Sequence, residues 1–361
     1  MRWAGRWALL AGVGLLGHGC VDGTEHESAD GSSMGDAAAV ESAADASAVG
    51  SSTPPSCRAR GAGLTNCGPQ SESCCTSLEV EGGTYNRTYT NSGTGAMGLA
   101  DPASVSSFRL DKYDVTVGRF RQFVAAWSSG WTPAEGSGKH THLSCGLGLA
   151  NAGNPGTYET GWLTTDESNV APTDVNLSDA ACDPLRGYAT WTPSAGAHEN
   201  LPINCVNWWE SYAFCIWDGG FLPSEAEWEY AAAGGNQQRE YPWGTTDPGT
   251  GNQYAIYGCY YPTGSGTCTT ASNIAPVGSA PLGAGLWGQL DLTGNLWQWN
   301  VDWYGIYVVP CTDCAYLTEA SSRVFRGASF SGFAAGLLPP TRYDLPSYRD
   351  IDVGVRCART P

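Results

Sequence analysis

The sequence is short of positive charge. Its 361 residues include 18 Lys or Arg against 35 Asp or Glu, which gives a formal net charge of −17. The only lysines are Lys112 and Lys139, and the arginines form no basic run. Binding to nucleic acid, or directly to an anionic membrane surface, depends on basic patches. We therefore expect no nucleic-acid partner and no electrostatic membrane contact.

Long apolar runs and sustained helical periodicity are also scarce. The apolar run at residues 7–16 is too short to span a membrane. The chain is instead rich in Gly (48), Pro (21) and aromatic residues (11%). This composition predicts an irregular, loop-rich domain in which aromatic side chains do much of the packing. The length allows one large core with appendages.

The N-terminus has the pattern of an export signal. Arg2 and Arg6 precede the apolar run, and Cys20 follows it in a Gly-His-Gly-Cys sequence. We interpret residues 1–20 as a signal peptide of the lipoprotein type, with Cys20 as the acylated residue. The protein is then an outer-surface or periplasmic lipoprotein that meets the membrane only through its lipid, with ordinary secretion as the alternative.

Two segments follow the predicted signal. Residues 21–56 are rich in Ala, Ser, Gly and acidic residues, contain no Lys or Arg, and read as an unfolded tether. Residues 57–75 are a cysteine-rich lead-in containing Cys57, Cys67, Cys74 and Cys75. Export and the lack of a standard metal spacing favour disulfides over a zinc site there.

Two helices are predicted in the middle of the chain. The first covers about residues 208–217, enters through Asn207 and ends at a Gly-Gly pair. The second starts at Ser224, whose capping box is completed by Glu227, and Gly234 ends it. For its three glutamates (Glu225, Glu227 and Glu229) we expect capping and solvation in preference to acid–base chemistry.

A strand followed by a helix is predicted over residues 105–127. Phe108, Leu110 and Tyr113 suit the strand, and Thr116 caps the helix. Arg119 and Arg121 fall outside the apolar face of this helix, so we expect both in solvent.

Residues 128–199 are polar and rich in turns. They contain His140, His142 and Cys145, which could form a metal site. We prefer a loop with exposed histidines and a Cys145–Cys182 disulfide, because short histidine motifs match by chance. Further on, Cys259 and Cys268 should pair across a turn. Cys311 and Cys314 should form structural disulfides, either with each other or in two separate bridges.

Several motifs resemble those of the formylglycine-generating enzyme (sulfatase-modifying factor) family. They are Phe-Cys-Ile-Trp at 214–217, Leu-Pro-Ser-Glu-Ala-Glu-Trp-Glu-Tyr-Ala at 222–231, Tyr-Pro-Trp-Gly at 241–244, GQLDLTGNLWQWNVD at 288–302, RVFRGASF at 323–330 and DVGVRCAR at 352–359. Phe221 replaces the family's arginine before the leucine. The resemblance covers residues 76–361 and is weakest at 128–199. It implies an α+β, irregular, disulfide-containing fold related to C-type lectin-like domains.

The resemblance also implies site residues. It places Cys215 beside Cys357, which implies a disulfide. The family's calcium ligands correspond to Asp291, Gly294, Leu296 and Gln298, where Gln298 replaces a glutamate and weakens the site. The two cysteines that hold copper in the family correspond to Gly332 and Leu337. Ser329 is retained, but a hydroxyl cannot bind copper as a thiolate does, so copper is not expected. Calcium remains a possible cofactor.

Two functions therefore compete. Family members oxidise the cysteine of a Cys-x-Pro-x-Arg peptide of sulfatases with their copper. Without the cysteine pair, we expect an exported binding or accessory module for a peptide, protein or glycan at the cell surface. The alternative is an oxidoreductase of the same family, with cysteine oxidation or altered metal-dependent chemistry, for which His140 and His142 are the candidate ligands.

Overall fold

The computed structural model describes residues 53–183 and 187–361. These residues belong to one compact unit that begins at Ser52. The predicted signal peptide, its lipidation site Cys20 and nearly all of the tether lie outside the described residues. Among the helices that are described, none is long and apolar enough to cross a membrane.

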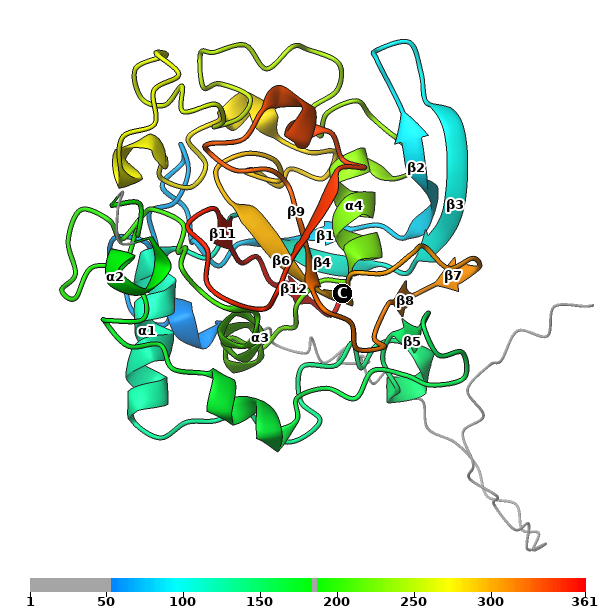
Figure 1. Ribbon diagram of the computed structural model, residues 1–361, viewed down its shortest axis with the longest axis horizontal. Helices are drawn as coiled ribbons and strands as arrows, with labels where there is room; N and C mark the ends of the chain where they lie inside the picture. The colour runs from blue at the N-terminus through cyan, green and yellow to red at the C-terminus, as the bar shows by residue number, and fades with distance from the viewer. Residues whose placement is uncertain (1–52, 184–186) are drawn as a thin grey trace, which may run out of the picture. The chain divides into compact units, whose positions relative to one another are not determined.

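The fold is α+β and loop-rich, as predicted, with short strands and few helices (Figure 1). The helices are α1 (Val117–Ser128), α2 (Asp179–Cys182), α3 (Trp208–Trp217) and α4 (Glu225–Ala233), with 3-10 turns η1 (Pro55–Cys57), η2 (Ser144–Gly146), η3 (Thr164–Asn169), η4 (Gly235–Gln237), η5 (Ala271–Asn273), η6 (Pro281–Gly283) and η7 (Ala334–Leu337). The strands are β1 (Ser77–Val80), β2 (Gly83–Thr90), β3 (Met97–Val105), β4 (Phe108–Asp111), β5 (Ala150–Asn151), β6 (Trp297–Trp303), β7 (Cys311–Thr312), β8 (Cys314–Ala315), β9 (Arg323–Arg326), β10 (Arg342–Leu345), β11 (Val353–Gly354) and β12 (Ala358–Arg359).

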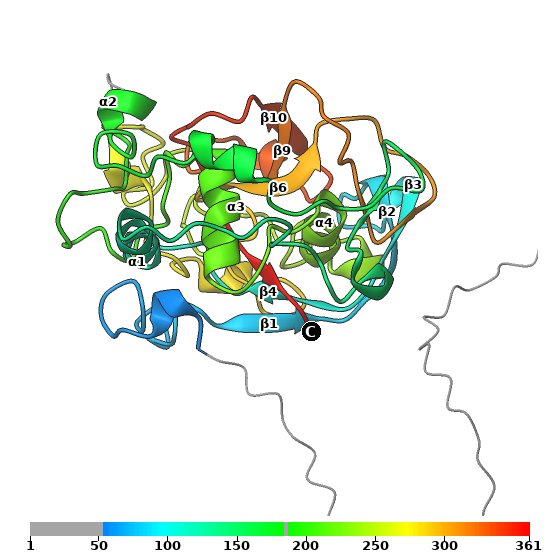
Figure 2. The ribbon, with the colours of Figure 1, turned by 90° about the horizontal axis from the view of Figure 1, so that it is seen from below.

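The strands form four small sheets. Their orders are β1-β4-β12, β10-β9-β6-β11, β2-β3-β7 and β5-β8. The C-terminal β12 pairs with β4, and β11 pairs with β6, so the end of the chain joins two sheets. Figure 2 shows α3 and α4 between the β1–β4 sheet and the sheet of β6, β9 and β10.

Helix starts follow the sequence closely. Thr116, Asn207 and Ser224 cap α1, α3 and α4, each accepting a hydrogen bond from the backbone N–H three residues on. Gly234 ends α4 in the left-handed conformation, with φ 66°. These signals are local, and local chemistry suffices to predict them.

The main core is aromatic, as the composition predicts. It joins α1, α3 and β6 through buried rings that contact one another, including those of Phe120, Phe123, Trp162, Phe214, Tyr212 and Trp299. The largest of these residues are fully buried. Aromatic packing thus takes over the role that longer helices and strands have in more regular folds.

Burial corrects the prediction for the two arginines of α1. Arg119 is fully buried and contacts Asp111 at 3.0 Å and Asp218 at 2.7 Å. It also donates to Ser56 and to the Cys74 carbonyl, which attaches the cysteine-rich lead-in to the domain. Arg121 pairs with Glu199 at 2.7 Å. Neither arginine is in solvent, because the lead-in and residues 128–199, which we call the middle loop, cover this side of the helix.

The glutamates of α4 are a second correction. The capping box forms, but Glu225, Glu227 and Glu229 are all buried, because α4 is covered on every side. Glu229 lies 2.8 Å from the guanidinium of Arg326, which also pairs with Glu225. Carboxylates without solvent need cationic partners, and those of Glu225 and Glu229 come from β9 and β10, which are distant in sequence.

The disulfides agree with most predictions. Cys215–Cys357 joins α3 to the C-terminal signature, as the family resemblance implied. Disulfides also form at Cys57–Cys75, Cys67–Cys74, Cys259–Cys268 and Cys311–Cys314. The predicted Cys145–Cys182 bridge is wrong, because Cys182 pairs with Cys205, 23 residues further along the chain.

Candidate functional site

The positions that correspond to the family's copper cysteines offer no ligand side chain. Gly332 follows β9 in a turn, and Leu337 is fully buried against Ala328. The nearby Ser329 hydroxyl is buried and lies 3.2 Å from that of Ser331. Hydroxyls and an aliphatic side chain do not provide the soft thiolates that Cu(I) prefers.

The residues predicted as calcium ligands lie in one turn before and within β6. The side-chain oxygen Oε1 of Gln298 accepts hydrogen bonds from Trp228 at 2.7 Å and Arg356 at 2.9 Å. Its amide nitrogen donates to the carbonyl of Asp291 at 2.8 Å, so two of the proposed ligands bind each other. The turn is closed by hydrogen bonds that a calcium ion would have to displace, and calcium stays a prediction.

His140 is not exposed, contrary to our preferred interpretation of the middle loop. Its ring is fully buried, with Nδ1 3.0 Å from Glu159 and Nε2 3.0 Å from Glu227. Burial opposes a charge on this ring, but the two carboxylates outweigh it and raise its pKa to about 10. Both nitrogens therefore carry protons at neutral pH and neither can bind a metal.

The neighbouring His142 does not rescue the metal hypothesis. Burial lowers its pKa, which favours the neutral ring that a metal binds, but the ring packs against Phe221 and one histidine is too few ligands for a metal site. Within residues 53–183 and 187–361, no three His, Cys, Asp or Glu side chains are grouped as a metal site requires. The ion pairs of His140 instead connect the middle loop to the start of α4.

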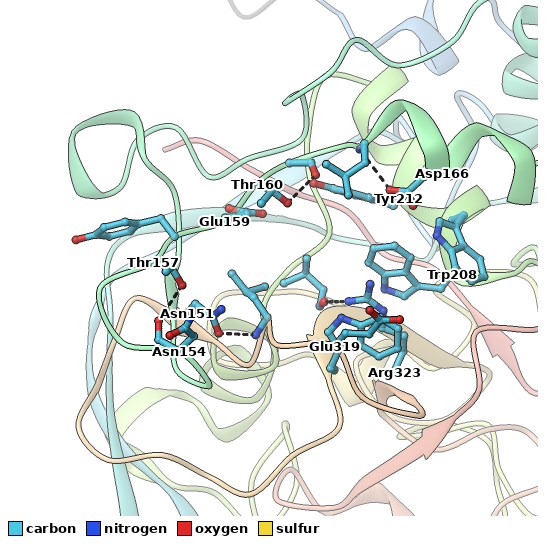
Figure 3. A pocket seen from close by; sticks show the side chains of 17 residues that line it. Asn151, Asn154, Thr157, Glu159, Thr160, Asp166, Trp208, Tyr212, Glu319 and Arg323 are labelled. Atoms are coloured by element: carbon cyan, nitrogen blue, oxygen red, sulfur yellow. Dashed lines mark hydrogen bonds between the residues drawn. The ribbon is translucent and has the colours of Figure 1, made fainter.

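A cavity of about 520 Å³ is the best candidate for a binding site (Figure 3). This volume is in the range of small-molecule sites, and the cavity is more enclosed than two other hollows of similar size. Its lining combines aromatic rings, carboxylates, amides and hydroxyls: Asn151, Asn154, Thr157, Tyr158, Glu159, Thr160, Gly161, Leu163, Asp166, Trp208, Trp209, Tyr212, Val301, Trp303, Leu317, Glu319 and Arg323.

Two parts of the chain build the cavity. The family-like elements α3, β6 and β9 supply Trp208, Trp303 and Arg323. The opposite wall comes from the middle loop, where Asn151 and Asn154 lie across the cavity from Arg323 in Figure 3. The middle loop is the part of the sequence that resembles the family least.

Arg323 is the one cation in this lining, and it is held unusually tightly. Its guanidinium lies 3.6 Å from the ring centres of both Trp208 and Trp303, and Nη1 donates to the Val301 carbonyl at 2.7 Å. The residue is only 8% exposed. Burial lowers its pKa to about 9, so it remains charged at neutral pH.

This buried arginine lacks an ion-pair partner among the residues that the structure describes. No carboxylate in the described parts of the chain lies within 4.0 Å of it, and its Nε atom is buried without a hydrogen-bond acceptor there. Asp166 and Glu319 also line the cavity but do not reach the guanidinium. Burial raises the pKa of Asp166, whose Oδ2 accepts a hydrogen bond from the Leu163 amide at 3.3 Å.

Sequence reasoning did not find this cavity, and it contains none of the predicted copper or calcium positions. Two of its residues do stand at recognisable positions in the sequence. Arg323 is the first residue of the RVFRGASF motif, and Trp208 is the first residue of a predicted helix. Nothing in the sequence indicates that these residues meet Asn151 and Asp166. The middle loop has no periodic pattern from which its path could be derived.

Comparisons with known proteins agree with the fold. Residues 65–361 match the family described as "Sulfatase-modifying factor enzyme 1-like domain". The formylglycine-generating enzyme of Mus musculus is 30% identical over 240 residues, which cover 63% of this chain and 58% of the mouse protein. The "Inactive C-alpha-formylglycine-generating enzyme 2" of Bos taurus is 31% identical over 175 residues, which cover 46% of this chain and 53% of the bovine protein.

The chain thus spans about half the length of these curated relatives. Among solved structures, PvdO from Pseudomonas aeruginosa is similar in fold, with a TM-score of 0.51 and 19% identity. The similarity covers 84% of this chain and 100% of that structure.

Proposed function

This chain belongs to the sulfatase-modifying factor enzyme 1-like family, and we propose that it uses the family fold as an exported binding module. In this proposal the protein is held at the cell surface by a lipid on Cys20. It binds a peptide, protein or glycan in the cavity between Arg323 and the middle loop. It does not oxidise cysteine with copper.

The replacement of both copper cysteines carries the proposal. A site with two thiolate ligands loses its soft donors when one position is Gly332 and the other is the buried Leu337. The enclosed cavity supports a retained binding role, because it combines aromatic walls with polar groups that can fix a ligand's orientation. A bovine relative described as inactive is consistent with loss of the family chemistry.

The alternative is an oxidoreductase of changed chemistry. It is favoured by the activity named for the mouse relative, a formylglycine-generating enzyme. It requires a metal held by residues other than Gly332, Leu337 and His140, or a different cofactor. Release of aldehyde product by the purified protein would support this alternative.

Binding can be tested with the mature protein on peptide and glycan arrays. Trp209→Ala removes one aromatic wall of the cavity and should lower the affinity for the ligand by roughly 10-fold or more. Trp243→Ala is a matched control, because Trp243 is also half-buried and stacks on Tyr241 outside the cavity. Equal losses in both variants would contradict a binding role for the cavity.

Lipid anchoring is tested separately. Cys20→Ser should release the full-length protein from the membrane fraction, because a single acylated residue is the proposed attachment. Unchanged membrane association of this variant would contradict the anchor without affecting the binding role.

A further inference from the structure

The surroundings of Arg323 leave only one part of its guanidinium available to a ligand. Both faces are covered by the indole rings of Trp208 and Trp303, each 3.6 Å away. Nη1 is already used by the Val301 carbonyl. What remains is Nη2, which makes no hydrogen bond to the residues that the structure describes; the adjacent Nε also lacks an acceptor but is closed off from solvent. A carboxylate accepts a strong, charge-assisted hydrogen bond from such a group.

The cavity does not suit a simple anion. Asp166, Glu159 and Glu319 also line it, and the protein as a whole carries a net charge of −17. Glu159 is balanced by His140, but Asp166 and Glu319 have no ion pair within the described parts of the chain. A negatively charged ligand without a positive group would be repelled from this side.

The cavity does not suit a simple cation either. Arg323 is buried and charged, so a cation beside it would add an unfavourable like-charge contact. A ligand that carries both charges satisfies both sides of the cavity. The remaining walls, Tyr158, Trp209 and Tyr212, can contact an apolar or aromatic group.

We propose that the cavity binds a zwitterionic ligand of the amino-acid class. Its carboxylate meets Nη2 of Arg323, and its ammonium group faces Asp166 and Glu319. This proposal rests on the binding function proposed above and specifies the chemistry of the ligand.

The test begins with calorimetry of the purified mature protein against each common amino acid. At least one should bind with a dissociation constant of about 1 mM or lower. For that amino acid, the amide derivative lacks the carboxylate and the N-acetyl derivative lacks the ammonium. Each derivative should bind roughly 10-fold more weakly, because one charge-assisted contact is lost.

Variants then assign each charge to its partner. Arg323→Met keeps an unbranched side chain between the two indoles but removes the guanidinium. The amino acid and its amide derivative should then bind with equal affinity. Asp166→Asn keeps an acceptor for the Leu163 amide and should reduce the discrimination between the free and acetylated amine. A variant that only disturbed the fold would lower the affinity for all ligands together. It would leave two affinity ratios unchanged: that of the amino acid to its amide and that of the amino acid to its N-acetyl derivative.

Arg121→Met provides a matched control for loss of a stacked arginine. Arg121 lies 4.3 Å from the ring centre of Trp191 but does not line the cavity. Its substitution should leave both ratios as in the unmodified protein.

Other ligands distinguish this proposal from the binding function on which it rests. Glucuronate and glucose serve as acidic and neutral sugar probes in the same assay. If no amino acid binds but a sugar or peptide does, and Trp209→Ala abolishes that binding, the zwitterion proposal is overturned while the binding module stands. If nothing binds in the cavity, both proposals fail.

Discussion

The Nε2 atom of His140 lies 3.0 Å from the Oε2 atom of Glu227, in the interior of the protein. The two residues are 87 positions apart in the sequence. Glu227 also completes the capping box of α4 by accepting a hydrogen bond from the Ser224 amide at 2.7 Å. One carboxylate thus starts a helix and holds the middle loop that forms a wall of the cavity.

We predict that this pair makes stability depend on pH. The pKa of His140 is raised from 6.5 to about 10, so its contribution is complete below pH 6.5 and is lost as the pH rises through about 10. Burial would raise the pKa of Glu227, but the imidazolium lowers it below 4.5. The contribution of Glu227 is therefore present above pH 4.5 and lost as the pH falls through the lowered value.

His140→Gln should cost roughly 3 kcal/mol of unfolding free energy between these limits, because it leaves two buried carboxylates without a cation. Urea denaturation at mildly acidic and at alkaline pH measures the difference. His198→Gln is the control, since His198 is half-buried and its ring, among the described residues, hydrogen-bonds to the Thr190 carbonyl and to no carboxylate. A loss that does not shrink at alkaline pH would contradict the ion pair.

The second prediction concerns the disulfide between Cys215 and Cys357. Its sequence separation is 142, and closing a loop of this size should stabilise the fold by roughly 5 kcal/mol in the chain-entropy model. Replacing both cysteines by alanine should therefore lower the unfolding free energy severalfold more than the same change at Cys311 and Cys314, which are separated by 3. Guanidinium denaturation without reductant compares the two, and equal losses would be the contrary result.

The third prediction concerns calcium. In Gln298→Glu the amide that donates to the Asp291 carbonyl is replaced by a carboxylate, which needs a cation at that point. The variant should melt lower than the unmodified protein in chelator and recover when calcium is added, while the unmodified protein responds weakly. Gln238→Glu, another buried glutamine, controls for the burial of a charge. Recovery of both variants alike would rule out a specific site.

The fourth prediction concerns the boundary between tether and domain. Ser56, which the sequence assigned to the tether, is fully buried, donates its amide to Asp218 at 2.9 Å and accepts from Arg119. A chain that starts at Thr53 should keep its melting temperature, because the acidic segment before it has no apolar periodicity. A chain that starts at Cys57 should melt several degrees lower. If the longer chain also melts lower, residues before Thr53 contribute to the fold.

Local features of this fold could be predicted from the sequence. Three helix caps and the positive-φ glycine after α4 depend on residues within four positions of each other. The pairing of Cys215 with Cys357 came from the family resemblance, since spacing alone allows many pairings among 14 cysteines.

Long-range burial could not be predicted. Arg119 meets Asp218 across 99 positions, and Arg326 meets Glu229 across 97. On a helical wheel Arg119 falls outside the apolar face of its helix, which ordinarily means solvent, and Arg326 lies on a strand whose partners the sequence does not show. The cavity has the same difficulty, because Arg323 and Asn151 belong to segments that only the folded chain brings together.

The loss of copper chemistry is the central claim and can be tested directly by mass spectrometry. The purified protein is given copper, oxygen and a Cys-x-Pro-x-Arg peptide, and the peptide cysteine is examined for conversion to the aldehyde. We predict that the cysteine remains unconverted, because neither Gly332 nor Leu337 provides a thiolate. Aldehyde that forms in proportion to the amount of this protein, and not with heat-denatured protein, would contradict the account.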